Sequence, residues 1–292
     1  MKTVGATRVL ECVVNVSEGR DAGVVGAIAA AGADALLDVH TDRDHHRSVL
    51  TLAGAGPRLE DAVRAVARAT VQRIDLGLHQ GAHPRLGALD VVPFVPLEPL
   101  GPGGTLGGAG SDLTPAIEAR DRFAVWAAEE LGLPCFCYGP ERTLPEVRRD
   151  AFGPLSPDTG PLEPHPTAGA CAVGARHLLV AYNVWLTTPD LRVARAVAAA
   201  IRGPGVRALG LAVGKATQVS CNLVDPFVVG PAEVYEAVRR LAADAGTGVD
   251  RAELVGLAPA AVVEAVPPAR RAALDLGPDR TIEGRLSRPG SS

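Results

Sequence analysis

The chain lacks a long hydrophobic run, although 47% of its 292 residues are hydrophobic. No stretch reaches the roughly 18 uninterrupted apolar residues that a membrane-spanning helix needs, so we expect no membrane span. The N-terminal residues also lack the apolar segment of a secretory signal, and we expect no such signal. The composition does provide enough apolar material for the core of two modest domains or one large one.

A surplus of basic charge is also missing, since the formal net charge is −4. A general nucleic-acid-binding protein would carry a positive excess, so we expect no nucleic-acid partner. Lysine is nearly absent, with only Lys2 and Lys215 in the chain. Arginine therefore has to supply the cationic contacts to an anionic ligand, and its guanidinium suits carboxylates because it makes bidentate pairs.

The cysteines follow neither a disulfide framework nor a zinc-site pattern. Their odd number, without a secretory signal, predicts free thiols in a reducing cytoplasm. Cys135 and Cys137 would share one face of a strand, but no second pair at zinc-site spacing accompanies them. We therefore interpret the cysteines as small buried hydrophobic residues. They are Cys12, Cys135, Cys137, Cys171 and Cys221.

Hydrophobic periodicity predicts one strand–helix order that occurs twice. Both halves have the order βαββαβ, so we interpret the chain as an α+β protein with two ferredoxin-like halves. A chance recurrence of a common alternation is the alternative; an asparagine after the first strand of each half, Asn15 or Asn183, favours duplication. In the first half we expect strands at 10–14, 35–39, 48–53 and 90–95 and helices at 21–32 and 57–73. In the second half we expect strands at 177–182, 206–213, 217–223 and 253–257 and helices at 189–202 and 230–245.

An insertion separates the two halves. The domain boundaries that follow are 8–176 for the N-terminal subdomain and 177–266 for the C-terminal subdomain. We expect residues 267–292 to form a frayed tail, with disorder at 287–292. Within the insertion we expect a helix at 114–131, a strand at 134–138, a short helix at 142–149 and a loop rich in proline and glycine at 153–169.

The most informative segment is residues 79–90, with the sequence His-Gln-Gly-Ala-His-Pro-Arg-Leu-Gly-Ala-Leu-Asp. Glycine and proline keep it from forming a regular helix, and a strand-like run follows at once. A histidine beside an arginine on a loop braced by a strand suits proton transfer next to an anion-binding site. The alternative is a polar turn with a solvated histidine.

Histidines and aspartates gather between residues 38 and 83, which makes a metal-dependent hydrolase an alternative function. His79 and His83 are spaced as in a zinc-binding helix. Gly81 between them and Pro84 after them break that helix, so we expect no metal ligands here. The alternative interpretation of the turn before residue 47 is a solvated hairpin loop without a functional role. The gathered residues are Asp38, His40, Asp42, Asp44, His45, His46, His79 and His83.

Four motifs in the same order resemble the formiminotransferase family (glutamate formimidoyltransferases). The resemblance extends from about residue 10 to about residue 266. It implies transfer of a formimino group from N-formimino-L-glutamate to N5 of tetrahydrofolate, in histidine degradation and one-carbon metabolism. It also implies tetrahydrofolate as co-substrate, no required metal and a homodimer. The motifs are residues 79–90, 11–20 (Glu-Cys-Val-Val-Asn-Val-Ser-Glu-Gly-Arg), 174–183 (Gly-Ala-Arg-His-Leu-Leu-Val-Ala-Tyr-Asn) and 218–225 (Gln-Val-Ser-Cys-Asn-Leu-Val-Asp).

The resemblance also assigns roles residue by residue. It places the catalytic histidine at His83 and substrate-binding side chains at Asn15, His40, Arg47 and Arg85. The folate-contacting loop of the family falls on ten consecutive residues, which we expect at the junction of the two halves, where a long ligand would be clamped. These residues are Gly160, Pro161, Leu162, Glu163, Pro164, His165, Pro166, Thr167, Ala168 and Gly169.

The chain departs from the family pattern at several positions. Ala82 stands where the family has a glutamate before the catalytic histidine, and His40 stands where it has an acidic residue. An acidic partner orients a catalytic histidine and raises its basicity, so a folate-binding protein without catalysis is a further alternative. Asp38, Asp42 and Asp44 are the candidates to replace that partner. The other departures are Gln80 for lysine, His46 for asparagine, and Ala168 for tryptophan, which removes a possible stacking surface.

Overall fold

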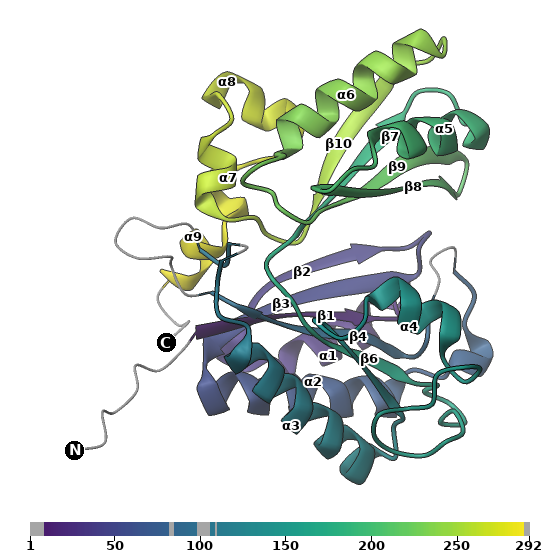
Figure 1. The fold of residues 1–292 in the computed structure, drawn as a ribbon, viewed down its shortest axis with the longest axis vertical. Coiled ribbons are helices and arrows are strands. Elements are labelled where there is room, and N and C mark those ends of the chain that lie inside the picture. The colour runs from purple at the N-terminus through teal and green to yellow at the C-terminus, as the bar shows by residue number, and fades with distance from the viewer. Residues whose placement is uncertain (1–8, 82–84, 98–105, 109, 289–292) are drawn as a thin grey trace. The chain divides into compact units, whose positions relative to one another are not determined.

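The computed structural model describes residues 9–81, 85–97, 106–108 and 110–288, and it divides into two compact units. The first unit covers residues up to His177, and the second unit covers Leu178–Arg288. Each unit combines one β-sheet with helices (Figure 1), which confirms the predicted α+β class. Within the described residues, no helix is long and apolar enough to cross a membrane.

The first unit contains a six-stranded sheet in the order β2-β3-β1-β4-β6-β5. Neighbours among β2, β3, β1 and β4 are antiparallel, whereas β6 runs parallel to both β4 and β5. The strands are β1 (Val9–Val16), β2 (Leu36–Asp42), β3 (Arg47–Ala55), β4 (Leu89–Pro96), β5 (Cys135–Tyr138) and β6 (Cys171–Ala175). The helices are α1 (Ala22–Ala30), α2 (Gly56–Arg73), α3 (Thr114–Leu131) and α4 (Leu144–Asp150), with short 3-10 turns η1 (Ala33–Ala35) and η2 (Leu76–Leu78).

Local sequence explains where these helices begin and end. Asp21 begins α1, because its side chain accepts hydrogen bonds from the N–H groups of Gly23 and Val24. Gly132 ends α3 in a left-handed conformation with φ +59°, which glycine adopts without steric cost. Helix α2 buries one apolar face, which includes Leu59 and Val63, as its periodicity predicts.

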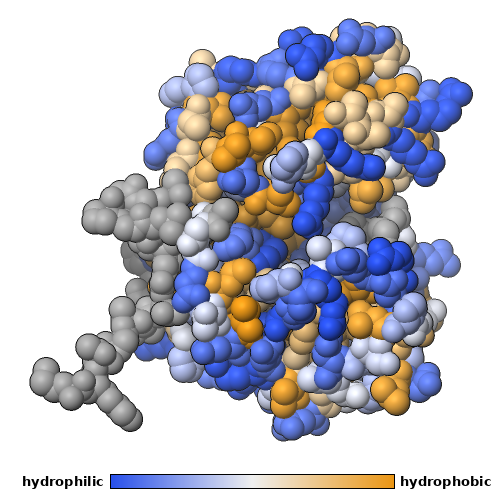
Figure 2. All heavy atoms as spheres, in the orientation of Figure 1, coloured by the Kyte–Doolittle hydropathy of each residue, from blue (hydrophilic) through white to orange (hydrophobic). Residues whose placement is uncertain are grey.

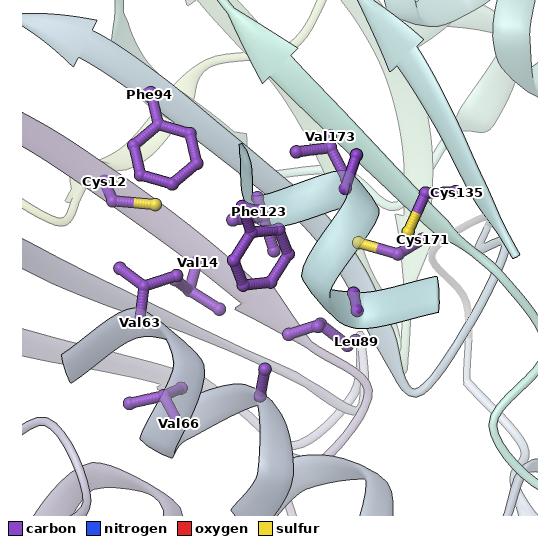
Figure 3. Packing of buried hydrophobic residues seen from close by; sticks show 14 of the residues in the cluster. Cys12, Val14, Val63, Val66, Leu89, Phe94, Phe123, Cys135, Cys171 and Val173 are labelled. Carbon is purple, nitrogen blue, oxygen red and sulfur yellow. The ribbon is translucent and has the colours of Figure 1, made fainter. Parts of the chain in front are cut away.

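The core of the first unit lies between the sheet and helices α2 and α3 (Figure 3). Phe94 of β4 packs there against Phe123 of α3, with ring centroids 6.1 Å apart. Cys135 and Cys171 are register partners on neighbouring parallel strands and lie next to one another in Figure 3. All five cysteines of the chain are free and buried, which confirms the prediction for them.

The second unit contains a four-stranded antiparallel sheet in the order β10-β7-β9-β8. In the view of Figure 2, apolar side chains form larger patches over this unit than over the first, where hydrophilic side chains predominate. Its strands are β7 (Val180–Leu186), β8 (Val206–Val213), β9 (Ala216–Leu223) and β10 (Val249–Val255). Its helices are α5 (Leu191–Ile201), α6 (Pro231–Asp244), α7 (Ala260–Glu264), α8 (Pro268–Arg271) and α9 (Ile282–Leu286), with 3-10 turns η3 (Ala272–Leu274) and η4 (Pro278–Arg280).

The two units share a strand order. Apart from the 3-10 turns η1 and η2, each unit begins with the sequence βαββαβ, from β1 to β4 and from β7 to β10. The order β2-β3-β1-β4 in the first sheet corresponds to β8-β9-β7-β10 in the second. Corresponding strands can therefore be compared position by position, β1 with β7 and β4 with β10.

Several details of the expected repeat were wrong, including the last strand, which is Val249–Val255 rather than 253–257. The first strand of the second half runs from Val180 to Leu186 rather than from 177 to 182, so Asn183 lies inside β7. Asn15 likewise lies within β1, not after it. Strand β6 was not expected at all; its five residues are all buried, so they lack the polar–apolar alternation that marks a strand with one exposed face.

The prediction of a frayed tail from residue 267 was also wrong for the part of the tail that the structure describes. Residues 267–288 contain α8, η3, η4 and α9. Leu274, Leu276 and Ile282 are buried, and the Tyr182 hydroxyl donates a hydrogen bond to the Leu274 carbonyl at 2.8 Å. This segment belongs to the core of the second unit, and residues 289–292 lie outside the described residues.

Candidate functional site

The histidine-containing loop lies between η2 and β4 in the first unit. Residues 79–81 and 85–88 of the loop are described, whereas Ala82, His83 and Pro84 lie outside the described residues. The assignment of His83 as the catalytic residue therefore stays a prediction. The geometry around the loop comes from the side chains that flank it.

Asp90, in β4, is the centre of a buried ionic cluster. Its Oδ2 atom accepts hydrogen bonds from Arg47 Nη1 at 2.5 Å and from Arg148 Nη2 at 2.7 Å. Its Oδ1 atom accepts from the Leu86 N–H at 2.6 Å, which ties the end of the loop to the strand. Arg47 also donates to Asn15 Oδ1 through Nε (3.2 Å) and Nη2 (3.0 Å). Arg47 thus links the Asp90 carboxylate to Asn15, and both Asn15 and Arg47 were predicted to bind substrate.

The electrostatics of this cluster favour the charged form of Asp90. Burial alone would raise the pKa of Asp90, but the charges of Arg47 and Arg148 and the Leu86 N–H lower it to about 2. The pKa of Arg47 is lowered by burial and by the charges of Arg148 and Arg85, against the opposing effect of Asp90. Several guanidinium groups thus act on one carboxylate, and such a cluster suits an anionic ligand.

Arg85 braces the loop from its C-terminal side. Its Nη2 atom donates to the Gly81 carbonyl at 2.7 Å, and its Nη1 atom contacts His79 Nδ1. Burial lowers the pKa of Arg85, and the charge of Arg20 lowers it further, against the effect of Asp90. Arg85 is therefore held over the loop by at least two contacts with residues of that loop.

His46 braces the same loop from its N-terminal side. Its ring lies 3.9 Å from the His79 ring, nearly parallel at 14°. His46 Nε2 is 3.0 Å from Glu18 Oε1, and His46 Nδ1 is 2.9 Å from the Gln80 carbonyl oxygen. His79 Nε2 is 3.1 Å from the His46 carbonyl oxygen. These contacts connect the segment before α1, the β2–β3 turn and the loop.

Glycine is needed where the loop approaches its neighbours. A Cβ atom on Gly81 would lie 2.6 Å from the His45 carbonyl oxygen, and one on Gly87 would lie 2.0 Å from the Ala170 carbonyl oxygen. Real Cβ atoms essentially never come so close to backbone, so a larger residue would push the loop away. The two glycines fix how tightly the loop packs on the first unit.

The loop predicted to contact folate, residues 160–169, packs beside the histidine-containing loop. The Thr167 carbonyl accepts from the Leu76 N–H at 2.8 Å, and the Ala168 carbonyl accepts from the Ala88 N–H at 2.9 Å. Ala168 is fully buried in the apolar core. A stacking surface at position 168 does not fit this placement, because the side chain points into the core, not toward a ligand.

The remaining predicted residues lie on or beside the β2–β3 hairpin. His40 pairs with Val49 in the register of β2 and β3. The Asp42 carboxylate accepts from the N–H groups of Asp44 and His45, so it closes the turn. Among the residues that the structure describes, no group of three or more His, Cys, Asp or Glu side chains is arranged to hold a metal ion.

Sequence reasoning missed four residues of this site, namely Glu18, His46 as a contact of the loop, Asp90 and Arg148. Glu18 carried a usable signal, because it lies in the motif at residues 11–20 that resembles the family. Its carboxylate accepts from the N–H groups of Gly19, Arg20 and Asp21. Arg148 carried no signal, since its partner is 58 residues away in the chain.

Comparison with known proteins shows the family of this chain. The model of the formiminotransferase domain, N-terminal subdomain, matches residues 9–176. The chain belongs to the formiminotransferase family. It is 34% identical to the glutamate formimidoyltransferase of Streptococcus pyogenes, over 87% of this chain and 90% of that protein. The glutamate formimidoyltransferase of Thermoplasma acidophilum is also 34% identical, over 86% of this chain and 88% of that protein.

Formiminotransferases also occur joined to a second activity. The formimidoyltransferase-cyclodeaminase of Sus scrofa is 34% identical over 87% of this chain, and the match covers 50% of that protein. This chain therefore spans about half the length of that relative. The resemblance seen in the four sequence motifs is confirmed as family membership.

Proposed function

We propose that this chain transfers the formimino group of N-formimino-L-glutamate to N5 of tetrahydrofolate, a step of histidine degradation and one-carbon metabolism. The proposal rests on 34% sequence identity to glutamate formimidoyltransferases over most of the chain. An arginine-rich site beside the family's histidine motif supports it. Tetrahydrofolate would act as co-substrate. The reaction needs no redox cofactor, because transfer of an amidine carbon changes no oxidation state, and we propose no metal.

The proposed mechanism is one of general acid–base catalysis. N5 of tetrahydrofolate attacks the amidine carbon of the donor, and a bond from N5 to that carbon forms. His83 takes the N5 proton and then gives it to the leaving glutamate nitrogen as the original carbon–nitrogen bond breaks. The contacts of Arg85 and His46 to residues 79–81 support this role, because they hold the segment directly before His83.

Arginine would position the substrates. We propose that Arg47 and Arg85 bind carboxylates, with Asn15 and His40 nearby, and we add Arg148 because it shares Asp90 with Arg47. Residues 160–169 would contact the folate; their hydrogen bonds to both ends of the histidine-containing loop support this assignment.

Three further proposals follow from the fold and composition. The shared strand order supports a duplicated ferredoxin-like fold, with subdomains at 8–176 and 177–266. The free, buried cysteines are typical of a reducing compartment, so we propose a cytoplasmic protein. We also propose a homodimer, as the family resemblance implies.

One experiment decides the function. The purified protein is incubated with tetrahydrofolate and N-formimino-L-glutamate, and 5-formiminotetrahydrofolate is followed by its absorbance and mass. Formation of this product supports the proposal. Tight folate binding without turnover would select the silent folate-binding alternative, which the departures at His40 and Ala82 favour. Hydrolysis that a chelator abolishes would select the metal-dependent alternative.

A further inference from the structure

The protonation state of His46 follows from its two partners. The Glu18 carboxylate can only accept a hydrogen bond while it is ionised, and the Gln80 carbonyl oxygen can only accept. Each ring nitrogen of His46 must therefore donate. Only the imidazolium form carries a proton on both nitrogens, so the geometry describes a cationic His46.

Glu18 is built to remain ionised. Its Oε1 atom accepts from the N–H groups of Gly19 (2.8 Å), Arg20 (2.7 Å) and Asp21 (3.0 Å), directly before α1. Burial works in the opposite direction, but these N–H groups and His46 lower the pKa of Glu18. A carboxylate held by the backbone in this way is a fixed anchor for the His46 ring.

His79 is in the neutral state, unlike His46. Arg85 can only donate, so His79 Nδ1 accepts from it, and His79 Nε2 donates to the His46 carbonyl. His79 is therefore neutral, in agreement with its lowered pKa, which results from burial and from the charges of Arg85 and His46. A cationic ring stacked on a neutral ring attracts it, whereas two cationic rings at 3.9 Å would repel one another.

We propose that His46 is a positioning residue of this formiminotransferase: as an imidazolium anchored by Glu18, it holds residues 79 and 80 of the histidine-containing loop against the β2–β3 turn. The inference rests on the proposed function for its catalytic meaning. It also gives a reason for the departure from the family pattern at this position, where the resemblance places an asparagine.

The substitution that tests the proposal is His46→Asn. His46 has φ +50°, and asparagine is among the residues that adopt this conformation most readily, so the backbone of the turn is preserved. Arg43→Gln is the matched control, because Arg43 is an exposed residue of the same turn that we place outside the site. The titratable and charged groups around the contact between His46 and Glu18 are Glu18, Arg20, Asp42, Asp44, His45, His79 and Arg85.

Three measurements are made on the full chain. We expect His46→Asn to lower kcat about 10- to 100-fold, with KM for tetrahydrofolate changed less than about threefold, because a misplaced loop loses orientation rather than ground-state binding. We expect amide exchange in residues 76–81 to rise at least about tenfold. In the unaltered protein at pH 7, nitrogen-15 spectra should show an imidazole protonated at both nitrogens whose signal His46→Asn removes. Arg43→Gln should leave all three results unchanged.

The outcomes separate this inference from the proposed function. If the unaltered protein transfers no formimino group, the proposed function fails, and the exchange and imidazole measurements still decide whether His46 holds the loop. Wild-type exchange in His46→Asn, unchanged kcat despite faster exchange, or a neutral His46 ring at pH 7 would each overturn the inference. If His46→Asn does not fold, the His46 nitrogens are assigned in the unaltered protein by through-bond correlation to the residue's own backbone, and a neutral ring there overturns the inference.

Discussion

The two units have the same strand order but place different chemistry on it. In the first unit, Asp90 of β4 binds Arg47, which in turn binds Asn15 of β1. In the second unit, Glu253 of the corresponding strand β10 accepts hydrogen bonds from Asn183 and the Trp185 indole of β7, at 3.1 and 3.0 Å. A carboxylate thus links corresponding strands in both units, but charged donors surround it in one, and neutral donors contact it in the other.

The histidines also differ between the two units. All seven histidines precede Leu178, so the second unit contains no side chain that commonly titrates near neutral pH. The two units together show that a shared strand order is not sufficient to form a functional site. Within the described residues, the histidines and the arginine cluster around Asp90 lie together in the first unit, and the following predictions test whether function divides in the same way.

The largest effect is expected at His83. Replacing it with alanine should lower kcat by roughly two to four orders of magnitude, because a general base contributes about that much, while the protein folds normally. Steady-state kinetics and circular dichroism check both parts. Full activity in His83→Ala would remove this residue from the mechanism and leave the division between the units without a catalytic basis.

The next effect concerns the two carboxylates. Asp90→Asn should lower the free energy of unfolding by about 3–5 kcal/mol, because it removes the buried carboxylate that the partly buried Arg47 and Arg148 share. Glu253→Gln should cost only about 1 kcal/mol, since an amide oxygen can still accept from neutral donors. Urea denaturation measures both variants. Equal losses would mean that the charge difference between the units has no energetic consequence.

A smaller effect is expected for Arg85→Lys. The KM for N-formimino-L-glutamate should rise about tenfold while kcat falls less than about threefold, because lysine keeps the charge but cannot make the forked contact. Arg251→Lys in the second unit, where the guanidinium lies 4.1 Å from the Trp185 ring, is the control and should leave KM unchanged. Unchanged kinetics in Arg85→Lys, or an equal rise in both variants, contradicts the assignment of Arg85.

The smallest effect is a shift in the titration of Asp90. Its pKa of about 2 lies below the usual 3.8, so its ionised form stabilises the fold above pH 4, and this contribution, roughly 2 kcal/mol, is lost as the pH falls toward 2. Arg148→Gln removes one of the charges responsible and should raise the pKa. Carbon-13 spectra of the Asp90 carboxyl group follow the titration, and an unmoved midpoint would show that Arg148 does not act on it.

The sequence predicts well what depends on nearby residues. Helix α3 and strand β8 have the predicted limits, because helix periodicity and strand alternation are local signals. Strand β6 escaped prediction because it is buried on both faces. The tail escaped because Leu274 and Ile282 are buried only through contacts with the rest of the second unit.

The candidate site also combines residues that local sequence predicts with residues that only the fold brings together. The motif at residues 79–90 and two of the arginines, Arg47 and Arg85, were recognisable along the chain. The Glu18–His46 and Arg148–Asp90 pairs join residues 28 and 58 positions apart, so they depend on strand order and turn geometry that no local pattern encodes. The Asn15–Asn183 correspondence was misleading, because a strand boundary is among the least certain features of a sequence.

The buried thiols can report when each of the two units unfolds. Four of them, Cys12, Cys135, Cys137 and Cys171, lie in the first unit, and Cys221 lies in the second. Burial raises the pKa of the Cys137 and Cys221 thiols to about 12, so a labelling reagent meets little thiolate until the fold opens. The order in which a thiol reagent marks these positions under mild denaturant, read by mass spectrometry, therefore records which unit opens first, without any engineered probe.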